Sequence, residues 1–382
     1  MSADALPPLQ RLSAVGQSVW VDFLSRDSIR GGHLQELIDD FAVVGATSNP
    51  TIFEKAMSEG SAYDEQLHGL VDGNPDPPDV ADVFWELAIQ DIKDACDLFH
   101  PVWAGERGAP PARDGYVSLE VDPRLAYDTL RTFRDAMRLH ERVDRPNLMV
   151  KIPATKPGLA AIEDVLAKGR SINVTLIFSL RRYAEVAESY IRGIERLVAE
   201  GGDPSGVASV ASFFVSRIDT EADRRLEEAS AEHPDAAGLR GKLAIANAKL
   251  AYAHYLEAFS GPRWEFLAGK GATPQRVLWA STSTKNPDYP DTLYVDGLIG
   301  PDTVDTMPEE TIKAYQDHGQ PQARLRQDLA GAHAVMDELA RVGVDYEDVT
   351  DTLEREGVEK FSASFEELLQ SLRAKRASLA PA

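Results

Sequence analysis

Short apolar runs alternate with amphipathic stretches along most of this chain. Eight runs rich in β-branched and other apolar residues have the length of buried strands; they are Ser18–Leu24, Ala42–Asn49, Tyr116–Val121, Asn147–Pro153, Ser171–Ile177, Val207–Ser216, Arg276–Thr282 and Thr292–Ile299. Apolar residues recur with helical spacing between them, as in Phe84–Phe99, Leu125–Arg142, Gly158–Lys168, Leu180–Ala199, Thr220–Ala229 and Gly238–Phe259. This alternation predicts an α/β fold in which eight parallel strands close into a (β/α)8, or TIM, barrel.

The chain of 382 residues is longer than the ~250 that such a barrel typically needs. Two further helical patterns, at about Pro321–Arg341 and Tyr346–Ala377, follow the last predicted strand. We expect them to pack on the outside of the barrel or over one end. The predicted organisation is therefore a single barrel domain at 1–382 with a helical extension at about 321–382. Pro- and Gly-rich composition predicts surface loops at Asp72–Pro78 and Pro101–Gly115.

One predicted strand, Asn147–Pro153, carries a lysine within an apolar run. Side chains alternate between the two faces of a strand, so Lys151 shares its face with Met149 and Pro153. A buried ammonium loses hydration unless it is paired or gives up its proton. A lysine that loses its proton in this way is the nucleophile that forms Schiff bases with carbonyl substrates. From this residue alone, a structural lysine paired with a carboxylate at the strand mouth is an equal alternative.

Polar side chains recur at the carboxyl ends of the predicted strands, where the chemistry of a barrel is found. They are Asp22, Asn49, Glu120, Lys151, Asn173, Thr175, Ser212, Arg217, Ser281, Ser283, Lys285 and Asp296. Each has a structural alternative, such as helix capping by a carboxylate, turn formation by Asn49 before Pro50, or pairing of Arg217 with Asp219 or Glu221. A ring of polar groups around one lysine favours a catalytic site.

Composition and charge narrow the classes of function. With 43% hydrophobic and 27% charged residues, the chain has the composition of a globular protein, and no apolar run approaches the ~18 residues of a membrane span. A formal net charge of −22 argues against binding to nucleic acid or anionic membranes, and a phosphorylated substrate would need a local basic cluster. Met1–Arg11 lacks a secretory pattern, and a single cysteine suits a reducing compartment, so we expect a cytoplasmic protein.

Several residues have mainly structural interpretations. Cys96 lies on an apolar helical stripe, which is typical of a buried and unreactive thiol. The eight histidines lack the spacing of a zinc site. Trp20 lies deeper than Asp22 on the same strand face and is expected to fill the barrel. The acidic stretch Glu354–Glu367 is most simply a solvated helix face.

Four separate segments resemble the transaldolase family, in the order in which that family has them: Gly45–Phe53, Val117–Pro123, Met149–Thr155 and Ile172–Ser179. The likeness extends from about residue 10 to 320. It implies a class I aldolase-type (β/α)8 barrel that acts through a lysine Schiff base, without a metal or other cofactor. The implied reaction moves a dihydroxyacetone unit from sedoheptulose 7-phosphate or fructose 6-phosphate to glyceraldehyde 3-phosphate or erythrose 4-phosphate, in the nonoxidative pentose phosphate pathway.

The resemblance also implies roles for individual residues. Lys151 would attack C2 of the ketose phosphate, and Asp22 would take the C4 hydroxyl proton. Glu120 would move protons through a bound water with help from Thr175. The substrate's hydroxyl groups would be held by Asn49 and Asn173.

The substrate phosphate is expected near Arg217 and Ser212. Many members of the family carry Ser-x-Arg on strand seven, whereas this chain has Ser281, Thr282 and Ser283, with Lys285 two residues further on. Lys285 is a candidate for the second positive charge, although a lysine is a point charge and lacks the guanidinium fork.

Three alternatives remain open on sequence grounds. A related Schiff-base aldolase would release dihydroxyacetone to water through the same lysine. A metal-dependent barrel lyase or isomerase would use Asp22, Glu120 and Asp296 as ligands for a hard cation. A noncatalytic barrel would act as an interaction module through its acidic helical tail.

Overall fold

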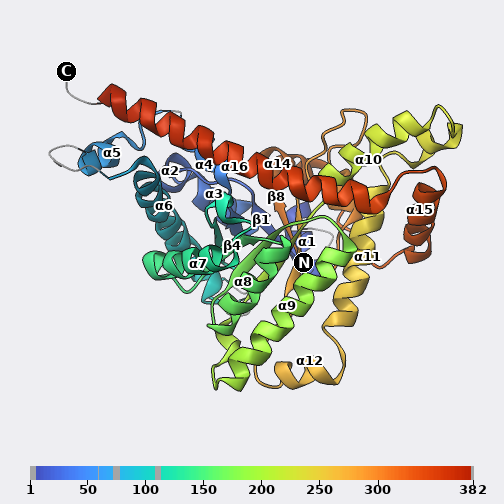
Figure 1. Cartoon of the computed structure of the whole chain (residues 1–382), viewed down its shortest axis with the longest axis horizontal. Helices are drawn as coiled ribbons and strands as arrows, with labels where there is room; N and C mark the ends of the chain where they lie inside the picture. The colour runs from blue at the N-terminus through green and yellow to red at the C-terminus, as the bar shows by residue number, and fades with distance from the viewer. Residues whose placement is uncertain (1–5, 59, 72–77, 108–112, 380–382) are drawn as a thin grey trace.

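The computed structural model describes residues 6–58, 60–71, 78–107 and 113–379. Eight parallel strands close into a barrel in sequence order, with β8 paired to β1. The strands are β1 (Gln17–Val21), β2 (Val43–Thr47), β3 (Val117–Glu120), β4 (Leu148–Pro153), β5 (Ile172–Ile177), β6 (Ser209–Phe214), β7 (Arg276–Ala280) and β8 (Thr303–Met307). The prediction of a (β/α)8 barrel with additional C-terminal helices is confirmed (Figure 1).

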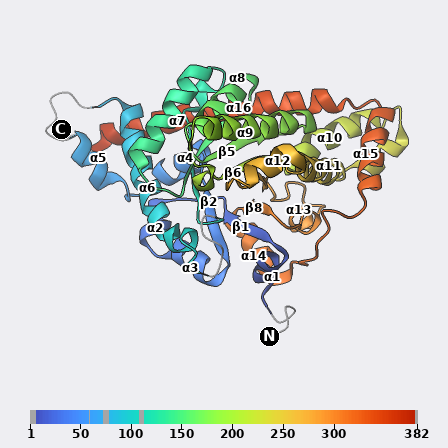
Figure 2. The same ribbon diagram turned by 90° about the horizontal axis from the view of Figure 1, so that it is seen from below.

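Helices surround the barrel and cover its outer face (Figure 1, Figure 2). They are α1 (Pro8–Val15), α2 (Arg26–Arg30), α3 (His33–Asp40), α4 (Pro50–Ser58), α5 (Asp64–Val71), α6 (Val80–Trp103), α7 (Thr129–Val143), α8 (Lys156–Ala167), α9 (Leu180–Ala199), α10 (Ser216–Ala229), α11 (Leu243–Ala258), α12 (Gly261–Ala268), α13 (Leu293–Gly297), α14 (Glu309–His318), α15 (Leu329–Arg341) and α16 (Tyr346–Leu379). Short 3-10 turns are η2 (Pro123–Leu125), η3 (Pro204–Gly206) and η4 (Pro234–Leu239). Among the described residues no helix is long and apolar enough to cross a membrane.

The eighth strand does not lie where the apolar pattern predicts it. The predicted strand Thr292–Ile299 contains helix α13, and the true β8 follows at Thr303–Met307. A short apolar run looks the same whether it is a buried helix or a buried strand, and Tyr294 and Val295 are indeed buried on α13. By contrast, β8 is short and carries a buried aspartate, Asp305, so its polarity hides it.

Several predicted segments have different bounds in the structure. The first C-terminal helix begins at Leu329, where the Asp328 side chain accepts a hydrogen bond from the Gly331 amide, and not at Pro321. Helix α6 continues to Trp103, so the predicted loop at Pro101–Gly115 starts later. Residues 108–112 of that loop, and residues 72–77 of the other predicted loop, lie outside the described residues.

The barrel interior is filled by side chains, and Trp20 is the largest of them. Trp20 is fully buried, and its indole N–H donates to Asp114 at 3.2 Å, which confirms a packing role. A Cβ atom on Gly45 would lie 2.5 Å from the Trp20 ring, so the ring fits only because β2 has a glycine there. The plug formed by Trp20 leaves the polar end of the barrel free for a site.

Helix α16 crosses the barrel at the carboxyl ends of the strands. In both views it extends from the neighbourhood of α10 and α15 to that of α5 (Figure 1, Figure 2), and it packs most extensively on α4. The C-terminal helices were expected to pack on the outside of the barrel or over one end, and α16 lies over one end. Its residues Lys360 and Phe361 face a pocket lined by the ends of seven strands.

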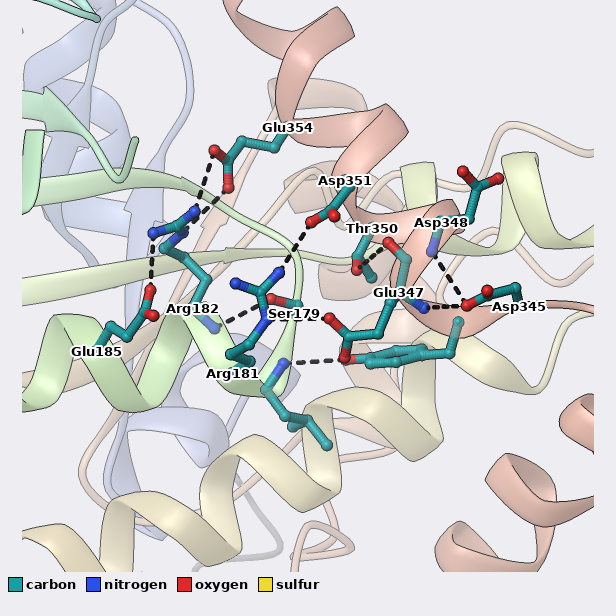
Figure 3. A network of polar contacts seen from close by, with 12 residues as sticks. Ser179, Arg181, Arg182, Glu185, Asp345, Glu347, Asp348, Thr350, Asp351 and Glu354 are labelled. Carbon is teal, nitrogen blue, oxygen red and sulfur yellow. Dashed lines mark hydrogen bonds and ion pairs between the residues drawn. The ribbon is translucent and has the colours of Figure 1, made fainter. Parts of the chain in front are cut away.

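Two arginines of α9 hold the first half of α16 in place (Figure 3). Arg181 of α9 pairs with Glu347 and Asp351, each at 3.0 Å. Arg182 is buried and contacts both carboxylate oxygens of Glu354, at 3.1 and 3.3 Å. The acidic stretch that the sequence suggested to be a solvated face is therefore partly an anchor.

The second half of α16 is fixed to the opposite side of the barrel. Thr51 of α4 donates to Ser364 at 2.9 Å, and Lys375 pairs with Asp64 of α5 at 2.8 Å. Because both halves of α16 are anchored to the barrel, its middle segment is held in a fixed position over the barrel opening.

Candidate active site

A pocket opens where the carboxyl ends of the strands meet. Most of the predicted site residues line it: Asp22, Asn49, Lys151, Thr175, Ser212, Arg217, Ser281, Ser283 and Lys285. Glu120 lies in contact with the Lys151 amine, and Asn173 lies behind Ser212. The barrel closure explains this gathering, because parallel strands bring their carboxyl ends to one edge regardless of the distance between them in sequence.

Lys151 lies at the centre of this arrangement, on β4. The register pairs Lys151 with Glu120 on β3 and with Asn173 on β5. The Lys151 residue is 5% exposed; its Nζ lies 3.5 Å from Glu120 Oε2 and donates to the Ser48 carbonyl at 3.3 Å. The ring of Phe361 lies 5.6 Å from Nζ, measured to the centroid. The amine is thus shielded from water while it still borders the pocket.

Burial dominates the electrostatics of Glu120. Loss of hydration raises the pKa of this carboxyl to about 7, although the Lys151 ammonium opposes the shift. The ammonium is the polar partner of the carboxylate among the described residues, and the Thr175 hydroxyl forms no hydrogen bond within the same set. A carboxyl that titrates near neutrality can both accept and release a proton at physiological pH.

Asp22 is the second carboxylate of the site, at the end of β1. Burial raises its pKa, while Lys151, a hydrogen bond from Thr47, and the charges of Arg217 and Lys285 oppose the shift. Thr47 Oγ1 donates to Asp22 Oδ1 at 2.8 Å and lies 2.7 Å from the hydroxyl of Thr306. Two carboxylates with different surroundings can take separate proton-transfer roles.

A chain of hydrogen bonds across the barrel orients Asn173. Its amide donates to Ser118 Oγ at 3.1 Å, and its carbonyl oxygen accepts from Ser212 Oγ at 2.6 Å. All three residues are buried. The amide plane is fixed by these two contacts, so the orientation of Asn173 is set before any ligand arrives.

Asn49 and Arg217 border the pocket from the first turns of two helices. The Asn49 side-chain oxygen accepts from the Ile52 amide at 3.0 Å at the start of α4, so the turn-forming role and the pocket position coexist. No ion pair joins Arg217 to a carboxylate among the described residues. The proposed surface partners are engaged elsewhere, since Asp219 accepts from Ala244 and Tyr294, and Glu221 pairs with Arg224 and Arg225.

The segment after β7 supplies further hydroxyl groups and a lysine to the pocket. Ser281 has a positive φ of 58°, and its hydroxyl lies 2.9 Å from that of Ser216. Lys285 Nζ donates to Ser283 Oγ at 2.6 Å. Thr282 turns the other way and donates to the buried Asp305 of β8 at 2.8 Å, which ties this segment to the barrel wall.

Asp296 is not part of the site. It lies on α13, where its oxygens accept from the Thr292 hydroxyl at 2.8 Å and the Gln320 amide at 2.9 Å. Its assignment to a strand end was wrong because the eighth strand was misplaced. The predicted alternative of a metal held by Asp22, Glu120 and Asp296 therefore loses one ligand. Among the described His, Cys, Asp and Glu side chains no group of three could hold a metal ion.

Several residues that line the pocket were not predicted from the sequence. They are Thr47, Thr51, Ile52, Lys55, Phe214, Ala280, Thr306, Pro308, Glu310, Lys360 and Phe361. Thr47 lies within a segment already singled out, and Phe214 lies two residues beyond Ser212, so strand periodicity would have found both. Thr306 required the correct eighth strand, and Lys360 and Phe361 required the position of α16. Cys96 is fully buried, and burial raises its thiol pKa, as expected of an unreactive cysteine.

Comparisons with known proteins identify the family of the chain. Residues 19–372 match the family described as transaldolase/fructose-6-phosphate aldolase. The chain is 52% identical over 362 residues to a transaldolase of Acidothermus cellulolyticus, covering 94% of this chain and 95% of the relative. It is 52% identical over 374 residues to a transaldolase of Parafrankia sp., covering 98% and 99%. It is 51% identical over 370 residues to a transaldolase of Mycobacterium tuberculosis, covering 96% and 97%.

Proposed function

Because this chain belongs to the transaldolase/fructose-6-phosphate aldolase family and is an enzyme that transfers aldehyde or ketone residues, we propose that it acts through a Schiff base on Lys151. It reversibly transfers a dihydroxyacetone unit from sedoheptulose 7-phosphate or fructose 6-phosphate to glyceraldehyde 3-phosphate or erythrose 4-phosphate. The pathway is the nonoxidative pentose phosphate pathway, and the compartment is the cytoplasm.

One observation carries this proposal. A buried lysine amine borders a pocket, 3.5 Å from a buried carboxylate, and the same pocket holds a second carboxylate together with Arg217 and Lys285. The amine supplies the nucleophile, the carboxylates supply proton transfer, and the cations supply attraction for a phosphate. Because the net charge of the chain is −22, a phosphorylated substrate needs a local basic cluster, and these two cations supply it.

In the first half of the proposed reaction, the neutral Lys151 amine adds to the C2 carbonyl of the ketose phosphate. The resulting carbinolamine loses water to give an iminium ion. Glu120 donates and accepts the protons of this step, and the Thr175 hydroxyl assists the proton transfer. The raised pKa of Glu120, about 7, supports this role because the group holds a proton in part of the population at neutral pH.

Asp22 then removes the C4 hydroxyl proton, and the C3–C4 bond breaks. The electron pair of that bond moves into the iminium ion, which becomes an enamine, and the first aldose phosphate leaves. A second aldose phosphate accepts the enamine carbon at its carbonyl, and Asp22 returns the proton to the new hydroxyl. Water then releases the product from Lys151. Asn49 and Asn173 hold substrate hydroxyl groups during these steps.

The test of this proposal is borohydride trapping with fructose 6-phosphate, followed by peptide mass spectrometry. We expect a reduced dihydroxyacetone adduct on Lys151. The Lys151→Met variant should keep its circular dichroism spectrum and lose both the adduct and turnover. Lys55→Met, which removes another pocket lysine, is the matched control and should still carry the adduct on Lys151. Turnover by Lys151→Met, or an adduct on a different lysine, would overturn the assignment.

Two controls separate the competing functions. Fructose 6-phosphate should be consumed only when an aldose phosphate acceptor is present; consumption at the same rate without an acceptor would favour an aldolase that releases dihydroxyacetone. Turnover should persist in a chelator, and its loss would favour metal-dependent chemistry. We also propose that the barrel and the C-terminal helices form one domain, supported by the anchoring of both halves of α16.

A further inference from the structure

Three basic side chains converge on one side of the pocket from three separate elements. Arg217 lies in the first turn of α10, Lys285 follows β7, and Lys360 lies in the middle segment of α16, over the barrel opening. The charges of Arg217 and Lys285, together with burial, lower the pKa of the Lys360 ammonium. The three cations therefore share one region of the site.

The three cations act on the buried carboxylates of the site only at a distance, as Arg217 and Lys285 do on Asp22. Neither Arg217 nor Lys360 forms an ion pair with any carboxylate in the part of the chain that the structure describes. Lys285 donates to a hydroxyl, that of Ser283. Like charges that share a partly buried region repel one another. The chain has 62 acidic residues, yet none of them pairs with these cations among the described residues. An anion bound among them would convert this repulsion into attraction.

The position of Lys360 does not depend on one flexible side chain. The next residue, Phe361, lies over the same site, with its ring 5.6 Å from Lys151 Nζ and 6.0 Å from the Arg217 guanidinium carbon. Arg182 and Lys375 hold α16 on either side of this segment. The helix therefore presents Lys360 to the pocket from a fixed backbone, although the side chain itself is largely exposed.

We propose that Lys360 is a substrate-binding residue that completes a three-cation site for the substrate's phosphate group with Arg217 and Lys285. This inference rests on the proposed function, and it assigns a role in substrate selection to the C-terminal helix. A phosphate presents several oxygens; the guanidinium grips two of them, and the two ammonium groups supply point charges on other sides. The arrangement compensates for the missing guanidinium on strand seven and selects phosphorylated sugars over free ones.

The test compares Lys360→Met, Lys360→Arg and a control, Arg373→Met. Arg373 is an exposed cation on the same helix, so its replacement by methionine changes the net charge by the same amount. It lies about 20 Å further along the helix axis, at 1.5 Å per residue, away from the pocket. For Lys360→Met we expect the KM for fructose 6-phosphate to rise about tenfold, because the variant loses one charge-assisted contact to the phosphate. We expect kcat to stay within about twofold because Lys360 does not touch the reacting carbons.

Competitive inhibition by inorganic phosphate gives a second readout. Its inhibition constant should rise in parallel with the KM for Lys360→Met, recover in Lys360→Arg and stay unchanged in Arg373→Met. A packing role for Lys360 would instead change kcat/KM equally for erythrose 4-phosphate and for unphosphorylated glyceraldehyde as acceptors. That equality, or an equal effect of Arg373→Met, would overturn the proposal.

Failure of this inference differs from failure of the proposed function. Binding of inorganic phosphate to the unmodified protein can be measured by calorimetry without any turnover. If transfer activity is absent but phosphate binding still weakens in Lys360→Met, the three-cation site stands and the reaction assignment falls. If transfer proceeds through Lys151 and Lys360→Met binds phosphate normally, the reaction stands and this inference falls.

Discussion

Replacing Glu120 with glutamine should change how the stability of the protein depends on pH. The ordinary pKa of a glutamate is 4.5, and burial raises that of Glu120 to about 7. Between these two values the folded protein holds a proton that the unfolded chain has released. The free energy of unfolding therefore falls as the pH rises through this window, and it levels off above pH 7. Glutamine cannot ionise, so the variant lacks this contribution.

The size of the effect follows from the two pKa values. A difference of about 2.5 pKa units corresponds to about 3 kcal/mol at 1.36 kcal/mol per unit. Part of this change occurs below pH 5, where the unfolded chain already begins to lose its proton. Between pH 5 and pH 8 the variant should therefore gain about 2 to 3 kcal/mol relative to the unmodified protein.

Urea denaturation followed by tryptophan fluorescence measures this difference at each pH, by linear extrapolation to water. Glu195 offers a control of opposite sign, because its hydrogen bond from Arg263 lowers its pKa. Substitution of Glu195 by glutamine should remove stability that is present at pH 8 and declines as the pH falls through the acidic range. A Glu120→Gln difference that is flat between pH 5 and pH 8, or that changes in the opposite direction, would refute the assignment of a raised pKa to burial.

Two further predictions concern catalysis. Lys285→Ala should raise the KM for phosphorylated acceptors with little change for an unphosphorylated one, because it removes one cation of the phosphate site; steady-state kinetics that show equal effects would contradict that role. Thr47→Val should raise the pKa of Asp22 further, because the hydrogen bond that lowers it is lost. The acidic limb of the kcat/KM profile should then move to higher pH by about one unit, and an unmoved limb would show that Asp22 does not govern it.

Seven of the strands were predictable because parallel strands in a barrel are covered on both faces. Such strands appear in the sequence as nearly continuous apolar runs, as in Ile172–Ile177, where every residue is buried. The eighth strand breaks this rule, since Thr303–Met307 places a buried aspartate between two threonines. Its Asp305 is satisfied by Thr282, which is 23 residues earlier in the chain, and no local pattern could indicate that partner.

The positions of most site residues followed from topology alone. Once strands are parallel and closed, their carboxyl ends meet, so Lys151, Asn173 and Ser212 lie together whatever the helices between them contain. The error at Asp296 has the same origin, because a wrong strand carries its end residues with it. Thr306 was lost for the same reason, although it contacts Thr47 at the site.

The contribution of α16 could not be predicted, because periodicity identifies a helix without fixing where it docks. Its apolar face predicts burial, yet Lys360 at one edge of that face looks like an ordinary solvated lysine. In its docked position α16 forms ion pairs with residues distant in sequence, such as Glu354 with Arg182 and Glu366 with Arg124. These pairs place acidic side chains of the helix against an arginine of α9 and an arginine of the turn η2.

That placement also explains how a strongly acidic chain presents a basic pocket. The anchoring carboxylates of α16 form ion pairs with Arg181, Arg182 and Arg225. Lys360 forms no ion pair among the described residues and lies above the barrel opening. Electrostatic screening limits the reach of exposed surface charges to about 8 Å at physiological ionic strength, so the net charge of −22 acts weakly on the interior of the pocket. The pairing pattern, more than the total charge, therefore determines which ligands the barrel opening attracts.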